Sequence, residues 1–219
     1  HLYYATGQDV WSYVPIPGAC GTSPSIDVTG AGPVELHIAY REFIPESTYE
    51  ISYISRDIDG SWASYPEILS NSPARFSTAP ELALDASGIP HVTWRETISA
   101  TAQVQYARGP DWAPVFTLSQ SAIGTTLPAF TIDTLGGRHA AWGDGASPSF
   151  NLLHTWSQPT DLWTAPDSVQ DTVFPIDDVV LCSDAQAGLD AAWVEGNTGE
   201  IWYARWSPRR VFLPLVTKN

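Results

Sequence analysis

The 219-residue chain contains no methionine, and Lys218 is its single lysine among ten basic residues, which face 24 acidic ones. The resulting formal net charge of −14 excludes nucleic acid and an anionic membrane surface as partners, because like charges repel. No run of about 18 apolar residues occurs, so we expect no membrane-spanning helix. Since methionine is absent, the chain is expected to begin after a processing boundary.

Cysteine is also scarce. Cys20 and Cys182 are separated by 162 positions, which excludes a local CxxC metal or redox motif. The two residues then form either a disulfide or a pair of buried thiols. We favour a Cys20–Cys182 disulfide, because other features of the sequence indicate an extracellular protein.

Helical periodicity is missing as well, so no α-helix is expected. One pattern recurs in its place, and its clearest copy runs from Pro80 to Trp94. Alternating apolar residues lead into a turn at 85–88, and a second alternating run ends on Trp94, which describes two paired strands. Further copies begin at Pro24, Pro128 and Pro175. A period of about 48 residues is the signature of a repeat architecture.

A second pair of strands completes each repeat. Its first strand carries a tyrosine or histidine (Tyr4, Tyr53, Tyr106, His154, Tyr203), and its second is predicted to begin at a tryptophan (Trp11, Trp62, Trp112, Trp163). Four short antiparallel strands per repeat predict an all-β fold, a β-propeller of four-stranded blades. Trp94, Trp142 and Trp193 occupy matching repeat positions and are expected to be buried between blades. The single predicted domain, 1–219, holds a half repeat at 1–18 and further repeats at 24–70, 77–122, 126–171 and 174–219.

The strand count of four to five repeats leaves the closure of the ring open. We favour a four-bladed ring in which Val10–Ile16 serves as the outer strand of the last repeat. That ring would bring Cys20 and Cys182 together, since the last repeat would lie beside the second. A fifth blade completed by a second chain, through self-assembly of unpaired blade strands, is one alternative. The other is that the chain is the C-terminal part of a longer precursor with more blades upstream.

The turn from Ser55 to Trp62 reads Ser-Arg-Asp-Ile-Asp-Gly-Ser-Trp. It resembles the Asp-box of sialidase-like (BNR-like) propellers, Ser-x-Asp-x-Gly-x-x-Trp, although its glycine comes one residue late. The strand pattern is similar to the repeats of bacterial extracellular propellers. The resemblance implies a folded turn whose aspartate binds backbone amides, and it specifies blades rather than chemistry. It also raises a sialidase-like glycosidase as the least favoured function, because the sequence shows no convergent site for one.

Three histidines hold the same repeat position: His37, His91 and His139. Neighbouring packed sheets lie about 10 Å apart, too far for these side chains to share one zinc ion, so no metal site is expected. Calcium is the single cofactor that the sequence leaves open, because aspartate oxygens recur in turns; the candidates are Asp57, Asp59, Asp144, Asp177 and Asp178. No Ser-His-Asp order, HExxH or phosphate-binding glycine loop occurs.

We therefore expect a secreted or cell-surface propeller without catalytic activity, with a structural, assembly or binding role. The alternative is a carbohydrate-binding, lectin-like propeller, because a sugar stacks well on an exposed indole. Three tryptophans lie off the repeat positions that the core needs and are the candidate ligand-binding residues: Trp156, Trp202 and Trp206. The ending Leu213–Val216 resembles the C-terminal ends of some bacterial secreted proteins, which favours an extracellular location.

Overall fold

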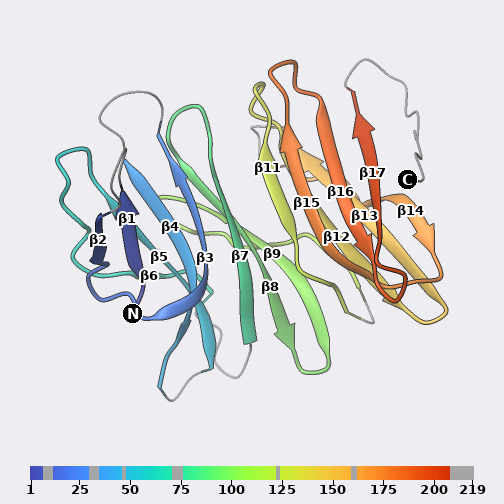
Figure 1. Cartoon of the computed structure of the whole chain (residues 1–219), viewed down its shortest axis with the longest axis horizontal. Helices are drawn as coiled ribbons and strands as arrows, with labels where there is room; N and C mark the ends of the chain where they lie inside the picture. The colour runs from blue at the N-terminus through green and yellow to red at the C-terminus, as the bar shows by residue number, and fades with distance from the viewer. Residues whose placement is uncertain are drawn as a thin grey trace.

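The computed structural model describes residues 1–6, 12–29, 35–45, 48–70, 76–121, 124–158 and 162–207. Within these ranges every regular element is a β-strand, which confirms the all-β prediction (Figure 1). The strands are β1 (Tyr3–Thr6), β2 (Ser12–Pro15), β3 (Gly21–Val28), β4 (Leu36–Phe43), β5 (Tyr49–Arg56), β6 (Glu67–Ile68), β7 (Phe76–Leu84), β8 (Pro90–Ile98), β9 (Thr101–Arg108), β10 (Phe116–Thr117), β11 (Ala129–Ile132), β12 (Arg138–Ala146), β13 (Ser149–Ser157), β14 (Asp167–Thr172), β15 (Ile176–Ser183), β16 (Leu189–Glu195) and β17 (Glu200–Trp206).

The strands form a row of propeller-like blades that follow one another along the chain. Blade I is β3–β6, blade II is β7–β10, blade III is β11–β14, and blade IV is β15–β17 within the described residues. Each blade is antiparallel in sequence order, and a single parallel pair, Tyr49 with Phe76, joins blades I and II at their edge. The β1–β2 hairpin precedes blade I. Figure 1 shows the hairpin at one end of the row and blade IV at the other.

The gaps between blades are filled by large aromatic side chains, as the repeat predicts. Trp94, Trp142 and Trp193 lie within the second strands of blades II, III and IV, which continue beyond them, and all three are buried. Each belongs to a different apolar cluster between two blades. The prediction that these tryptophans lie between blades is confirmed, and it fixes the register of the whole repeat.

The gaps between blades I and II and between blades II and III, like the contact of the β1–β2 hairpin with blade I, also hold a tyrosine from the preceding sheet and a tryptophan from the turn after the third strand. The ring pairs Tyr4–Trp62, Tyr53–Trp112 and Tyr106–Trp163 have centroids 6.1, 4.8 and 4.9 Å apart. These turn tryptophans precede the outer strands, so the prediction that the outer strands begin at them is wrong. The outer strands start at Glu67, Phe116 and Asp167 instead.

The four-bladed ring is not formed among the described residues. The β1–β2 hairpin packs on blade I, where Leu2 and Tyr4 join the cluster around Tyr40, and β17 pairs with β16 alone. The predicted Cys20–Cys182 disulfide is likewise absent, because both cysteines are free and exposed. Cys20 precedes β3 at one end of the row, and Cys182 lies in β15 at the other. Trp11 and the C-terminal ending lie outside the described residues.

The repeated histidines belong to buried hydrogen-bonded chains within blades, not to a shared metal site. In blade II, His91 Nε2 lies 3.4 Å from Asp85 and its Nδ1 lies 2.7 Å from the Tyr106 hydroxyl. In blade III, His139 contacts Asp133 in the same way at 3.2 Å. Its other nitrogen faces His154, which stands where blade II has the tyrosine. Blade IV has Asp190 at the histidine position, bonded to Tyr203 and Arg205.

The turn that resembles an Asp-box is folded, but the aspartate that binds a backbone amide is Asp59 and not Asp57, the aspartate of the motif. Asp59 Oδ1 accepts hydrogen bonds from the backbone N and the hydroxyl of Ser61, at 2.8 and 2.6 Å. These bonds lower the pKa of the Asp59 carboxyl. The turn closes blade I between β5 and Trp62, which is a structural role.

Replacing Trp94 by alanine should destabilise the protein by about 3–5 kcal/mol, because the change empties the gap between blades I and II. Urea unfolding measures the loss. Tyr65→Ala is the matched control, since that ring is exposed and its removal should change the free energy of unfolding by less than about 0.5 kcal/mol. Equal effects of the two substitutions would contradict the assigned register.

The buried histidines should make the fold acid-sensitive. Burial lowers the pKa of His91 to about 4 and, with the nearby His139, that of His154 to about 3, from the usual 6.5. As pH falls below 6.5, the unfolded chain therefore binds protons that the folded chain cannot, and stability declines. His154→Tyr restores the residue of blade II and removes one of these groups, so its melting temperature should fall less between pH 6.5 and 4 than that of the unchanged protein. Parallel curves would show that His154 carries no such linkage.

Candidate functional site

A cleft lies at the edge of the gap between blades I and II. Its volume is about 330 Å³, within the range of small-molecule sites. Blade I contributes side chains from β4, β5 and β6, and blade II contributes the turn before β8 and the turn after β9. The lining residues that carry polar or aromatic groups are His37, Tyr53, Ser55, Glu67 and Trp112.

His37 and Tyr53 form a hydrogen-bonded pair at this cleft. The Nδ1 atom of His37 lies 2.5 Å from the Tyr53 hydroxyl, and both side chains are more than nine-tenths buried. The other ring nitrogen, Nε2, is buried and has no hydrogen-bond partner among the described residues. The nearest carboxylate oxygen, from Glu35, is 3.8 Å away, beyond hydrogen-bond distance. A buried nitrogen without a partner is costly, which marks it as a group that a ligand could satisfy.

The unpaired nitrogen is a departure from the repeat. In blades II and III the same nitrogen meets Asp85 and Asp133. These aspartates stand two residues beyond the residue that pairs with the histidine across the strands. Thr29 occupies that position in blade I, and its hydroxyl accepts a bond from the backbone N of Glu35 instead. His91 and His139 thus have a partner at each ring nitrogen, whereas His37 has one at Nδ1 alone among the described residues.

Burial sets the protonation of the pair. It lowers the pKa of His37 below 6.5, although Glu35, Asp27 and Asp57 pull it upward, so the imidazole is neutral at pH 7. Burial also raises the pKa of Tyr53 to about 12, so the phenol keeps its proton. When Nδ1–H donates to the Tyr53 oxygen, the neutral imidazole carries its lone pair on Nε2 and can take up a proton there, which is the requirement of general base catalysis.

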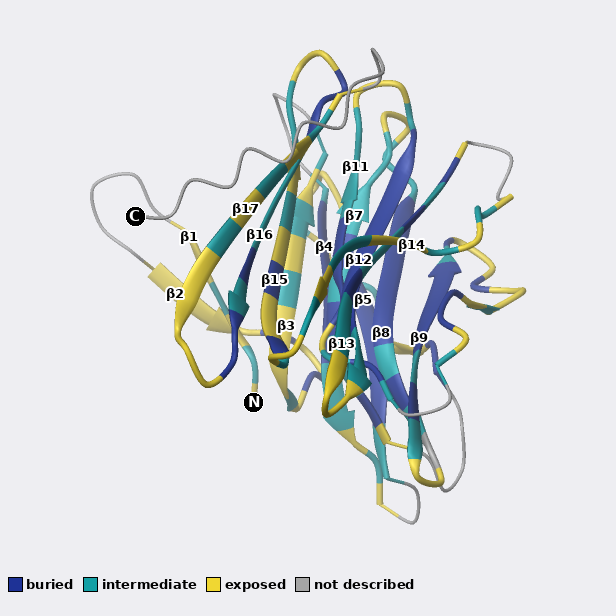
Figure 2. Cartoon of the chain, turned by 90° about the vertical axis from the view of Figure 1, so that its right-hand side faces the viewer, coloured by how far each residue is buried: buried dark blue, intermediate teal, exposed yellow. Residues whose placement is uncertain are grey.

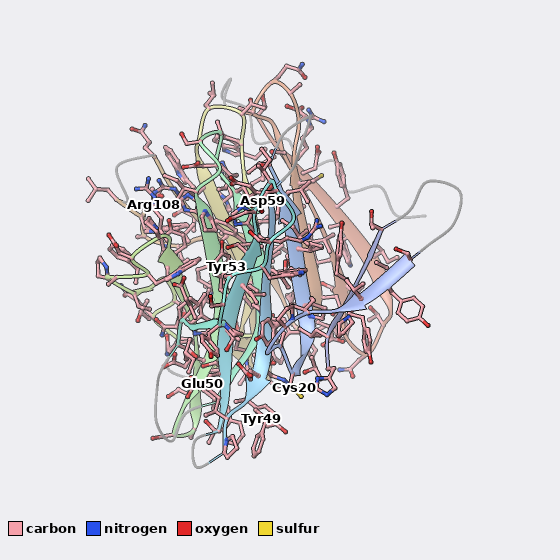
Figure 3. The ribbon with its side chains drawn as sticks, turned by 90° about the vertical axis from the view of Figure 1, so that its left-hand side faces the viewer. Cys20, Tyr49, Glu50, Tyr53, Asp59 and Arg108 are labelled. Carbon is pink, nitrogen blue, oxygen red and sulfur yellow. The ribbon has the colours of Figure 1, made fainter. Side chains whose placement is uncertain are left out.

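Trp112 forms the aromatic wall of the cleft and is held under backbone strain. Its φ of 54° lies in the left-handed region, which a bulky residue rarely adopts. Its ring centroid is 4.8 Å from that of Tyr53, and its Nε1 donates a 2.7 Å hydrogen bond to Glu67 of β6. These contacts span the two blades and fix the indole beside the His37–Tyr53 pair. Strained residues of this kind concentrate at functional sites. Figure 3 shows Tyr53 on β5, with Glu50 of the same strand on one side of it and Asp59 of the following turn on the other.

The tryptophans selected from the sequence lie elsewhere. Trp156 and Trp206 both contact His139, with ring centroids 6.4 and 5.7 Å away, at the edge of blades III and IV. Trp202 packs into the apolar cluster between those blades and is apart from the histidine. The cavity beside them measures about 30 Å³, room for little more than a water molecule. Ligand binding by Trp156, Trp202 and Trp206 stays a prediction.

Glu81 and the aspartates considered for calcium are not part of the cleft lining. Burial raises the pKa of Glu81 on β7 to about 7, but this side chain is not part of the cleft lining. Of the residues considered for calcium, Asp59 binds Ser61 and Asp144 accepts a 2.5 Å bond from Ser121. No cluster of three His, Cys, Asp or Glu side chains suited to a metal occurs within the described ranges. Calcium binding stays an untested prediction.

No protein-family model matches the chain, and no curated protein matches it significantly. Solved structures share its fold. A protein of unknown function from Dyadobacter fermentans has a TM-score of 0.61 at 11% identity, over 86% of this chain and 66% of that one. A PL25 polysaccharide lyase, an ulvan lyase bound to a glucuronate–rhamnose 3-sulfate unit, has a TM-score of 0.62 at 11% identity, over 92% of this chain and 58% of that one. An endo-arabinase from Bacteroides thetaiotaomicron has a TM-score of 0.51 at 11% identity, over 85% and 74%.

The chain thus spans between about a half and two thirds of the first two of these proteins, and at such identities the likeness concerns the fold. It supports a propeller-like architecture and gives no sign of sialidase-type repeats. No helix in the described part of the chain is long and apolar enough to cross a membrane. The expectation of a non-catalytic structural or binding protein is contradicted, because the fold neighbours of known activity are enzymes that act on carbohydrates.

Proposed function

We propose that the chain is a glycan-active enzyme whose proton-transfer site is the cleft between blades I and II. The observation that carries this proposal is the buried His37 Nε2 atom, which has no hydrogen-bond partner among the described residues and belongs to a side chain that lines a cleft of about 330 Å³. In this function Nε2 exchanges a proton with the glycan or with a water molecule that attacks it. The Tyr53 hydroxyl holds the imidazole in position through Nδ1.

The shape and chemistry of the cleft support a sugar as the substrate. Trp112 and Tyr53 are aromatic residues in the lining of the cleft, and aromatic rings of this kind pack against the apolar face of a sugar. Ser55 and Glu67 add oxygens that can bind hydroxyl groups. The carbohydrate-active proteins among the fold neighbours agree with this substrate class.

The charge around the pair favours a neutral glycan over an acidic one. Glu35, Asp27 and Asp57 all act electrostatically on His37. Together with the net charge of −14, they would repel a uronate or a sulfate group. A glycan substrate also agrees with a secreted or cell-surface location, which we propose for the protein.

Tyr53→Phe should lower kcat/KM on the cleaved glycan by about 100-fold or more, because the phenol that positions His37 is lost while the ring stays against Trp112. A panel of neutral and uronate-containing polysaccharides, read by reducing-end release, first identifies the substrate. Tyr106→Phe is the matched control, since it removes the same hydroxyl from blade II, and it should leave kcat/KM unchanged. Full activity in folded Tyr53→Phe, or equal losses in both variants, would overturn the proposal.

Thr29→Asp should inactivate the enzyme without altering the histidine, because it introduces the carboxylate that holds Nε2 in blades II and III. In the unchanged protein, activity should fall as pH drops through the lowered pKa of His37, below 6.5, where the base becomes protonated. The added carboxylate favours the imidazolium, so any residual activity of the variant should be lost at a higher pH. An unchanged pH profile would contradict the assignment of His37 as the base.

A further inference from the structure

The outer face of blade IV is the face that points away from blade III. In blades I–III the same face packs against the next blade, but within the described residues no blade covers it in blade IV. Ile201 on β17 stands two residues before Tyr203, the position that Ile51, Val104 and Leu152 hold in blades I–III. Those three residues are 0% exposed, because the next blade covers them, whereas Ile201 is 75% exposed. Tyr203 matches Tyr53 and Tyr106 and is 44% exposed against 7% and 0%.

The exposed residues form one continuous surface. Val180, Ala192 and Tyr203 are directly opposite one another on β15, β16 and β17, and Val194 with Ile201 forms the next row. Cross-strand partners point to the same side of a sheet, so these five side chains make an apolar centre. Cys182, Asp190 and Arg205 form a neighbouring polar row. An apolar centre with a polar rim is the anatomy of a protein interface. Figure 2 faces this end of the molecule and shows exposed stretches along β15 and β17.

The opposite end of the row also exposes apolar side chains of a blade face. The β1–β2 hairpin covers the part of blade I formed by Leu36, Ile38, Tyr40 and Ile54. Ile26 and Val28 of β3 are the cross-strand partners of Ile38 and Leu36, so they share this face. They are nevertheless 55% and 45% exposed, because the hairpin supplies the matching third and fourth strands of a blade and not the first two.

We infer that the two open ends bind each other in separate molecules, so that the blade IV face of one copy packs against the Ile26–Val28 face of a second copy. The leading face of a blade is the one that points toward the preceding blade. Within the chain, every gap joins the outer face of one blade to the leading face of the next. The exposed faces are the outer face of blade IV and the part of the leading face of blade I that the hairpin leaves open, and a second copy carries both. Such head-to-tail contact is heterologous and can extend to rings or longer assemblies. The inference is independent of the activity proposed above.

The test measures the mass of the 219-residue chain by light scattering from about 1 μM to about 1 mM, under reducing conditions that prevent cross-linking through Cys20 and Cys182. The expected result is a rise above the 23.8 kDa of one chain. Ile201→Glu and Ile26→Glu, each alone, should abolish the rise, and Leu135→Glu, at an exposed turn residue of blade III, should not. Circular dichroism confirms that each variant is folded.

Mixing the two variants decides between head-to-tail and face-to-face contact. Ile26→Glu keeps an intact blade IV face, and Ile201→Glu keeps an intact leading face, so their mixture should form a dimer and stop at twice the mass of one chain. A protein that is monomeric at every concentration would overturn the inference. So would association of Ile26→Glu by itself, because that result would show two blade IV faces in contact.

Discussion

The structure depends on one constraint: each blade has two apolar faces, and both must be covered. A four-stranded sheet cannot remove its faces from water by itself, so successive blades bury them against one another. Trp94, Trp142 and Trp193 in the second strands of blades II, III and IV are the largest side chains in this burial, and Trp94 and Trp142 are completely enclosed. The tyrosine of the previous blade and the tryptophan of the next turn complete the gaps between blades I and II and between blades II and III. The hydrogen-bonded histidines, the cleft and the open ends all take their positions from this packing.

Repetition made much of this architecture predictable. A residue that recurs at the same place in several copies marks a position that each blade needs, and the alternating pattern assigns it to one face of a strand. The tryptophans were therefore identified as inter-blade residues from sequence alone. The outer strands were placed too early because Trp62, Trp112 and Trp163 serve as turn residues, which pack into the gap before the fourth strand begins. The spacing of the tryptophans does not distinguish a tryptophan that begins an outer strand from one that lies in the turn before it.

The ring closure and the disulfide were wrong for a different reason. Strand counting treats blades as exchangeable pieces, whereas closure depends on the angle between packed sheets, which no local pattern encodes. The hairpin could have completed blade IV by count. In the structure it covers blade I instead, where Leu2 and Tyr4 meet an apolar face that would otherwise be exposed. Cys20 and Cys182 consequently stay at opposite ends of the row, and their pairing depended entirely on the ring.

The candidate site escaped prediction because its residues look like repeat consensus. His37 shares its position with His91 and His139, and this equivalence by itself predicts a structural role. The informative signal was a small one: the first copy has a longer turn, and Thr29 replaces the aspartate that holds the other two histidines. Loss of that carboxylate leaves Nε2 buried and without a hydrogen bond within the described chain, a cost to stability that the two intact copies avoid. In a repeat protein, each blade can differ from its neighbours while the shared packing is kept. A site can therefore arise where one copy lacks a stabilising contact that the others retain, and the search for function is best directed at such exceptions.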